Sequence, residues 1–155
     1  MSVSHFESVV RRFQNESLKT PALVLLEGDL GVGKTSFVKE LFREWGYDPA
    51  KVQSPTFLKL LEHKIPSQGL CLHLDCYRME DTEDFEKLAL ENYLEASFWF
   101  VEWPEIFLKY LGEQPVLAKL LGFKTQLKLD FEMLESGERK VSFSRLELFA
   151  SLTSP

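Results

Sequence analysis

The chain has 155 residues, of which 45% are hydrophobic and 27% charged, so it should form one globular domain over residues 1–150, followed by a disordered tail at 151–155. A net charge of −6 argues against strong direct binding to nucleic acid, which normally needs a basic excess. No segment is apolar enough to span a membrane, and the first residues lack the features of a signal peptide. Two cysteines form no disulfide framework, which favours a reduced, cytoplasmic setting.

The first expected element is an amphipathic helix over residues Ser4–Leu18. Ser4 and Glu7 form a capping-box pattern at its start. Apolar residues then recur at helical spacing: Phe6, Val9, Val10 and Phe13. We expect this helix to cover one face of a sheet.

A glycine-rich loop follows, between a predicted buried strand at Leu23–Leu26 and a predicted helix at Ser36–Trp45. Its residues satisfy the pattern G-x-x-x-x-G-K-[ST], in which backbone N–H groups surround a phosphate at the start of a helix. In this pattern Lys34 reaches the β- and γ-phosphates, and the Thr35 hydroxyl binds Mg²⁺. The predicted nucleotide-binding residues are Gly28, Asp29, Leu30, Gly31, Val32, Gly33, Lys34, Thr35 and Ser36.

Two candidate site residues come next in the chain. Thr56, in the sequence SPTF, has a hydroxyl that can sense the γ-phosphate or its Mg²⁺, as switch segments do. Taken alone, the SPT sequence favours a turn threonine without function over a switch residue. Asp75 ends a predicted strand at Leu70–Asp75, at the sheet edge where α/β proteins bind ligands. We expect no zinc site, because the spacing of the nearby side chains does not suit tetrahedral coordination: His63, Cys71, His73 and Cys76.

The second half of the chain supplies a further carboxylate. Residues Asp81–Ala96 are predicted to form an acidic amphipathic helix. The apolar run Ser97–Trp103 reads as a buried strand that ends in Glu102, which is the form of a Walker B element that holds Mg²⁺. Two short helices, at Glu105–Leu111 and Pro115–Leu121, precede a predicted hairpin within Gln126–Phe149.

Four motifs occur in an order and spacing that resemble the bacterial TsaE (YjeE) family: GDLGVGKTSFVKEL, SPTF, HLDCYR and VEWPE. The resemblance implies an α/β, three-layer P-loop NTPase fold, with a mostly parallel central sheet, helices on both faces and a C-terminal β-hairpin. It also implies a small Mg²⁺-dependent ATPase needed to make N6-threonylcarbamoyladenosine at position 37 of tRNA. In that family the ATPase binds a TsaD–TsaB pair and resets it between turnovers, so tRNA would be contacted indirectly, through the complex.

The resemblance also implies roles for individual residues. Gly31 to Thr35 would bind the ATP phosphates, with Lys34 catalytic and Thr35 a ligand of Mg²⁺. The remaining implied positions are Thr56 in a switch-like loop, Asp75 near the metal and the hydrolytic water, Glu102 as second metal-side carboxylate, Trp103 beside the nucleotide, and Ser4 with Arg139 or Lys140 near the base or ribose.

The chain departs from the family pattern at two positions. Ala89 stands where the family usually has glycine, and we expect it to be tolerated because alanine is the better helix former by about 1 kcal/mol. Ile106 stands where a basic residue is usual, which could alter a partner contact. Arg78 is a candidate arginine finger in cis, and a partner residue is another.

Other functions stay open on the sequence alone. A small-molecule kinase on the same fold would need a lid with several arginines, and between Asp75 and Glu102 the chain has only Arg78. A GTPase is disfavoured because there is no N-K-x-D motif. A nucleotide-sensing binding module with negligible turnover is the third alternative.

Overall fold

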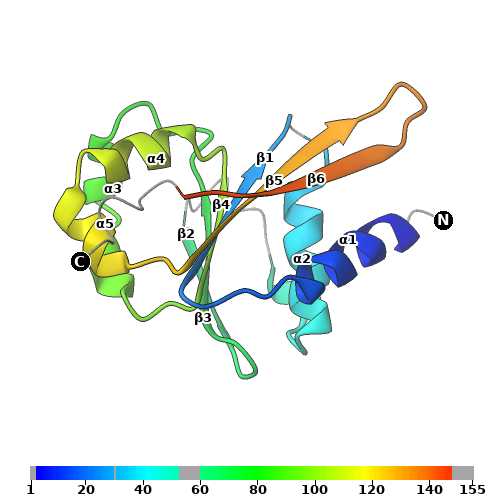
Figure 1. Ribbon diagram of the computed structural model, residues 1–155, viewed down its shortest axis with the longest axis horizontal. Helices are drawn as coiled ribbons and strands as arrows, with labels where there is room; N and C mark the ends of the chain where they lie inside the picture. The colour runs from blue at the N-terminus through cyan, green and yellow to red at the C-terminus, as the bar shows by residue number, and fades with distance from the viewer. Residues whose placement is uncertain (1–2, 30, 53–59, 148–155) are drawn as a thin grey trace.

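A six-stranded sheet forms the centre of the computed structural model, which describes residues 3–29, 31–52 and 60–147 (Figure 1). The strand order is β2-β3-β4-β1-β5-β6. The three inner pairs, β3 with β4, β4 with β1 and β1 with β5, are parallel, and the outer pairs are antiparallel. The strands are β1 (Ala22–Glu27), β2 (Leu60–Ile65), β3 (Gly69–Asp75), β4 (Phe98–Glu102), β5 (Thr125–Met133) and β6 (Arg139–Arg145).

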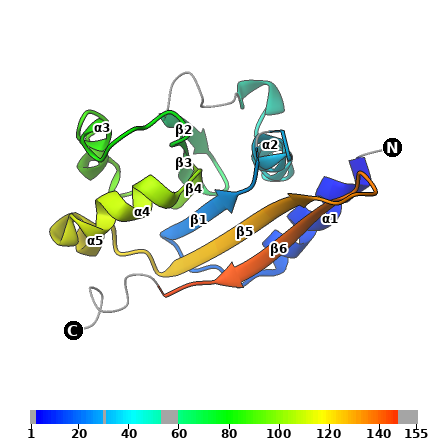
Figure 2. The same ribbon diagram turned by 90° about the horizontal axis from the view of Figure 1, so that it is seen from above.

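Helices cover both faces of this sheet, as the view from above shows (Figure 2). On one face lie α1 (Val3–Asn15) and α2 (Lys34–Glu44). On the other lie α3 (Glu83–Glu86), α4 (Glu105–Gly112) and α5 (Pro115–Leu121). Two single 3-10 turns, η1 (Pro49–Lys51) and η2 (Leu90–Tyr93), lie in the connections. The predicted three-layer α/β architecture is therefore confirmed.

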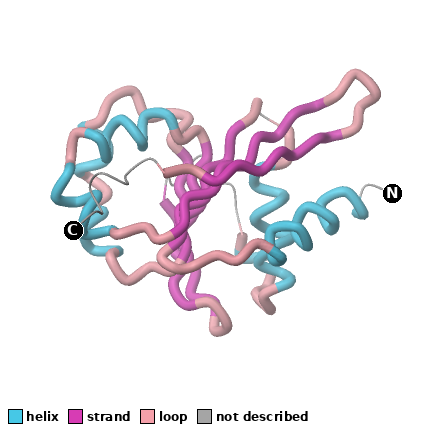
Figure 3. The backbone as a smooth tube through the Cα atoms, viewed as in Figure 1, coloured by secondary structure: helices cyan, strands magenta, loops and turns pink. Residues whose placement is uncertain are grey.

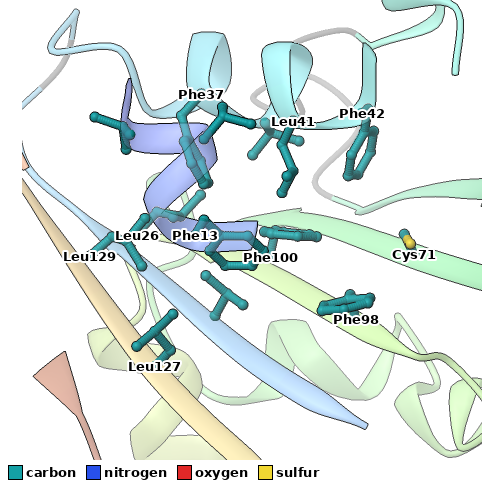
Figure 4. Close-up of a cluster of buried hydrophobic side chains, with 14 of the residues drawn as sticks. Phe13, Leu26, Phe37, Leu41, Phe42, Cys71, Phe98, Phe100, Leu127 and Leu129 are labelled. Atoms are coloured by element: carbon teal, nitrogen blue, oxygen red, sulfur yellow. The ribbon is translucent and has the colours of Figure 1, made fainter. Parts of the chain in front are cut away.

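The alternation of side chains along the strands divides the core in two. Val24 and Leu26 of β1 point towards α1 and α2, whereas Leu23 and Leu25 point towards α4 and α5. Figure 4 shows the first cluster, in which Phe13 of α1 and Phe37 of α2 meet edge to face with ring centroids 5.6 Å apart. Because β1 is apolar on both faces, it belongs at the centre of a parallel sheet, which places the loop that follows it between the two layers.

The C-terminal hairpin of β5 and β6 extends well beyond the other strands (Figure 3). β5 pairs with β1 on one side and with β6 on the other, and β6 forms the edge of the sheet. The sequence predicted this hairpin correctly. Its turn contains Gly137 at a φ of 87°, a left-handed conformation that glycine adopts without strain.

The predicted helix at Asp81–Ala96 is wrong. The segment forms the single turn α3 and the turn η2, separated by Ala89 in a left-handed conformation with φ 52° and ψ 60°. The left-handed region penalises a residue with a Cβ atom, so glycine, and not alanine, is the favoured residue at this position. The helix propensity of alanine is therefore no reason for Ala89 to be tolerated, because the residue does not lie in a helix.

Other expected boundaries shift by only a few residues. The first helix ends at Asn15 instead of Leu18, and the helix after the glycine-rich loop begins at Lys34 instead of Ser36. The predictions for Leu30 and for the SPTF segment with Thr56 fall outside the described residues. No helix in the part of the chain that the structure describes is long and apolar enough to cross a membrane.

Candidate functional site

The loop between β1 and α2 depends on glycine at two close backbone approaches. Gly28 has a φ of 146°, and a Cβ atom there would lie 2.6 Å from the carbonyl oxygen of Phe131. Gly33, at a φ of 105°, caps α2, and an added Cβ atom would overlap the ring of Phe6. The first backbone N–H groups of α2 have no partner within the helix and carry its partial positive charge. The loop therefore has the features of an anion-binding site.

Lys34, the first residue of α2, lies folded back over this loop. Its ammonium group is buried, donates a hydrogen bond to the carbonyl oxygen of Gly28 and lies 3.9 Å from the centroid of the Trp103 ring. Burial lowers the pKa of Lys34, an effect that the carboxylates of Glu102 and Asp75 oppose. Two carboxylates and an aromatic face thus surround a buried cation beside the loop.

Glu102 is the point where the glycine-rich loop meets the sheet. Its Oε2 atom accepts hydrogen bonds from the Thr35 hydroxyl at 2.9 Å and from Nε2 of His73 at 2.5 Å. Burial raises the pKa of this carboxyl group, but the hydrogen bonds from His73 and Thr35 and the charge of Lys34 outweigh burial and hold the pKa below its ordinary value. Glu102 is therefore an ionised carboxylate in a buried position.

Asp75 lies directly beside Glu102. The two residues are register partners at the ends of the parallel strands β3 and β4, and each is about 5% exposed or less. Asp75 Oδ1 accepts the backbone N–H of Tyr77 at 2.8 Å, which fixes the carboxylate at the turn after β3. The structure brings together Lys34, Thr35, Asp75 and Glu102, four of the residues that sequence reasoning selected.

A pocket of about 650 Å³ opens next to these residues, between the glycine-rich loop, the end of β3 and the start of α4. Trp103 lines it in a left-handed conformation with a φ of 54°, and its ring lies 4.9 Å from that of Tyr77. Gly28, Asp29 and Ile106 also line the pocket. Trp103 therefore forms an aromatic wall beside the loop, and its role next to a nucleotide stays a prediction.

The three candidates for contacts with the base or ribose come from α1 and β6. The Arg139 guanidinium is 5.5 Å from the centroid of the Phe6 ring, and this ring packs on Gly33. The Phe6 ring therefore lies between Arg139 and the loop. Lys140 is exposed on β6. Ser4 lies in the first turn of α1, which places its backbone on the same side as Phe6, and its side chain is outside the description.

Sequence reasoning missed the contribution of His73. His73 was assigned no role beyond a rejected zinc site, although the residue stands in the HLDCYR motif. It is fully buried and bonds directly to Glu102. Its signal in the sequence is its position two residues before Asp75, which places both side chains on one face of β3.

Among the residues that the structure describes, protein side chains alone do not enclose a divalent metal. Within residues 3–29, 31–52 and 60–147, no group of three or more His, Cys, Asp and Glu side chains is arranged to hold a metal ion. Mg²⁺ typically binds to one or two carboxylates together with substrate phosphates and water. The Thr35 hydroxyl and the adjacent carboxylates of Glu102 and Asp75 are oxygen donors of that kind, so the residues present fit Mg²⁺ bound together with a nucleotide.

A glycine-rich loop that leads from a central parallel strand into a helix, with carboxylates at the ends of two neighbouring strands, defines the P-loop NTPase fold. Within this class the chain belongs to the TsaE family: the family model "Threonylcarbamoyl adenosine biosynthesis protein TsaE" matches residues 2–141.

Curated relatives carry the same description, tRNA threonylcarbamoyladenosine biosynthesis protein TsaE. The protein from Rickettsia bellii (strain RML369-C) is 38% identical over 101 residues, which cover 65% of this chain and 69% of that protein. The protein from Rickettsia felis (strain ATCC VR-1525 / URRWXCal2) is 32% identical over 127 residues, or 82% of this chain and 67% of that protein. The protein from Aquifex aeolicus (strain VF5) is 32% identical over 129 residues, or 83% and 80%.

Proposed function

We propose that this chain is a Mg²⁺-dependent ATPase that acts in the formation of N6-threonylcarbamoyladenosine at position 37 of tRNA. One observation carries the proposal: Thr35 of the phosphate loop is hydrogen-bonded to Glu102 at the end of β4, with Lys34 and Asp75 alongside. The membership of the chain in the TsaE family supports the same pathway.

The buried lysine supplies the main attraction for ATP. Its ammonium group now bonds to the Gly28 carbonyl and lies against Trp103. A phosphate oxygen is a stronger acceptor than a carbonyl, so we expect Lys34 to exchange this bond for the β- and γ-phosphates. The backbone N–H groups from Gly31 to Ser36 would bind the remaining phosphate oxygens.

The carboxylates have a different role from the lysine. Thr35 and Glu102, with Asp75 beside them, would hold Mg²⁺, which when bound neutralises charge on the phosphate oxygens. Asp75 is the residue that we propose orients the attacking water, because its carboxylate is fixed by the Tyr77 N–H at the strand end. Thr56 stays a proposed switch residue outside the described residues.

Hydrolysis by the isolated chain should be slow, because transition-state stabilisation by an arginine is not built into the loop. Arg78 is exposed, two residues beyond the buried Cys76 of the pocket wall, and is a candidate in cis. A residue of the partner is the other candidate. An unchanged complex-stimulated turnover in Arg78→Ala would eliminate the role in cis.

The proposed partner is the TsaD–TsaB complex, which this chain would bind and reset between turnovers. The net charge of −6 is consistent with docking on a protein, with tRNA contacted through the complex. The cytoplasm, where tRNA is modified, is the compartment in which we propose that it acts.

The test is ATP hydrolysis with Mg²⁺, measured for the chain alone and with the cognate TsaD–TsaB pair. Lys34→Ala and Glu102→Gln should each remove the stimulated activity, because the first deletes the phosphate contact and the second the charge of the metal ligand. Lys39→Ala is the matched control, because Lys39 is an exposed lysine on the same helix.

Stimulation by the pair that both site variants abolish would support the proposal. If the pair neither binds nor stimulates while a metabolite screen finds phosphoryl transfer, the chain is a kinase and the proposal is wrong. If ATP binds and the chain still affects the pair in Glu102→Gln without any turnover, a nucleotide sensor replaces the ATPase.

A further inference from the structure

Two buried imidazoles lie behind the site, on the antiparallel strands β2 and β3. His63 is 4% exposed, and His73 has no exposed surface. His63 is the register partner of Cys71, so His73, two residues further along β3, is its diagonal neighbour on the same face of the sheet. The two rings therefore lie close together inside the core.

One nitrogen of each ring has a hydrogen-bond partner. Nδ1 of His63 is 3.0 Å from the hydroxyl of Tyr47, and Nε2 of His73 is 2.5 Å from Oε2 of Glu102. The second nitrogen of each ring, Nε2 of His63 and Nδ1 of His73, is buried and has no hydrogen-bond partner among the residues that the structure describes. A buried polar atom without a partner costs about 1–3 kcal/mol, so two such atoms on neighbouring rings require an explanation.

The hydrogen bonds to Tyr47 and Glu102 determine which nitrogen of each ring carries the hydrogen. A carboxylate only accepts hydrogen bonds, so Nε2 of His73 is the donor to Glu102, and in the neutral ring Nδ1 is then an acceptor. If the Tyr47 hydroxyl donates to Nδ1 of His63, the hydrogen of that ring is on Nε2. The unpartnered nitrogens are then complementary, a donor on His63 and an acceptor on His73, and one water molecule that bridges them would satisfy both.

We propose that Tyr47, His63 and His73 form a buried chain of hydrogen bonds, closed between the imidazoles by one water, that positions the Glu102 carboxylate. All donors in this chain point the same way, from the phenol towards Glu102. The inference rests on the proposed function, because it assigns positioning residues to the metal-side carboxylate of that site. None of the three residues touches the nucleotide in this scheme.

Such a chain has a clear purpose in a site that binds metal. Glu102 ends β4, and without a fixed partner its side chain is free to rotate about its own bonds. Hydrogen bonds from His73 and Thr35 to one oxygen fix the orientation of the carboxylate. Partners of this kind commonly change metal affinity by about 10- to 100-fold when they are removed. This series of hydrogen bonds also connects the site to Tyr47, in the segment that follows α2.

The first test reads the ring hydrogens directly. The chain has three histidines, so nitrogen NMR of the protein at neutral pH resolves each ring, and His5→Gln, His63→Gln and His73→Gln assign the signals. We expect hydrogen on Nε2 and none on Nδ1 in both His63 and His73. A hydrogen on Nδ1 of His73, in the other tautomer or in the imidazolium, would overturn the proposed chain.

The second test measures ATP binding by calorimetry, with Mg²⁺ and with EDTA. His73→Leu should reduce the gain in ATP affinity that Mg²⁺ provides by about 10- to 100-fold. His73→Gln should recover most of that gain, because its amide N–H can replace Nε2 as the donor to Glu102. Tyr47→Phe, which removes only the hydroxyl, should cause a smaller reduction in the same direction.

The outcomes separate this inference from the proposed function. If the wild-type chain does not bind ATP, the proposed function fails. If it binds ATP with help from Mg²⁺ and folded His73→Leu shows the same gain, the positioning role is wrong. Equal losses in His73→Leu and His73→Gln would also overturn it, because the donor to Glu102 would then not be the feature that matters.

Discussion

Replacement of Ala89 by glycine should make the protein more stable. Ala89 has a φ of 52° and a ψ of 60°, where a residue with a Cβ atom loses about 1–2 kcal/mol relative to the right-handed conformation. Glycine avoids this strain but gives the unfolded chain more freedom, which costs about 0.4–1 kcal/mol. The difference predicts that Ala89→Gly raises the free energy of unfolding by about 0.5–1 kcal/mol.

Urea and thermal denaturation, followed by circular dichroism, provide the assay. For a chain of this size, 1 kcal/mol corresponds to a shift of about 2–4 °C, so the expected increase in melting temperature is about 1–4 °C. Ala118→Gly is the matched control. Ala118 is buried within the helix α5, where glycine lowers stability by about 1 kcal/mol or more.

The two substitutions are chemically identical and should act in opposite directions. If Ala89→Gly lowers the melting temperature as Ala118→Gly does, the segment between α3 and η2 is helical in solution and the reasoning is refuted. An unchanged urea slope for Ala89→Gly would show that the substitution acts on stability and not on the extent of unfolding.

Three further predictions concern single residues of the loop, the hairpin turn and the core. Gly28→Ala should lower the free energy of unfolding by about 3 kcal/mol or more, because the new Cβ atom would meet the backbone of Phe131. Gly137→Ala has open space around it and should lose only about 1 kcal/mol through backbone strain. Urea denaturation measures both changes. Burial and the neighbouring imidazole lower the pKa of His63 from 6.5 to about 4. The neutral His63 ring therefore contributes about 3 kcal/mol to the free energy of unfolding above pH 6.5, and this contribution is lost as the pH falls to 4. His63→Gln should flatten the dependence of the free energy of unfolding on pH between 6.5 and 4, and an unchanged slope would contradict the prediction. Burial raises the pKa of Cys71 to about 12, so the folded protein should leave this thiol unlabelled by maleimide at pH 8, and rapid labelling would show that the strand opens.

Local patterns predicted the parts of the fold that depend on near neighbours in sequence. The glycines predicted the turn from β1 into α2 because that backbone needs residues without a Cβ atom, and Lys34 with Thr35 completed the sequence pattern of a phosphate loop. The apolar run that ends in Glu102 predicted a buried strand with a carboxylate at its end, which the structure confirms. Strand order was beyond this reasoning, because pairs such as β1 with β5 join segments about one hundred residues apart and depend on packing.

The errors and omissions have physical causes of the same kind. Hydrophobic spacing around Phe85 suggested one long helix, but periodicity does not reveal a single residue with left-handed backbone geometry such as Ala89. The contact between His73 and Glu102 joins two neighbouring strands, and the two residues are 29 positions apart in the chain. Polar groups on alternating strand positions indicate a shared face, whereas their partners on the next strand follow only from the sheet register.

The order of strands has a consequence for folding during synthesis. β1 leaves the ribosome early, but its two neighbours in the sheet, β4 and β5, end only at Glu102 and Met133. Until then the phosphate loop has neither its carboxylate partner nor the strand that supports Gly28. Contacts between residues so far apart in the sequence slow folding, since the intervening chain must first be brought into a closed loop at a cost in entropy. The proposed nucleotide site therefore assembles late in synthesis, and a ribosome-bound fragment that ends before Glu102 should have no competent site.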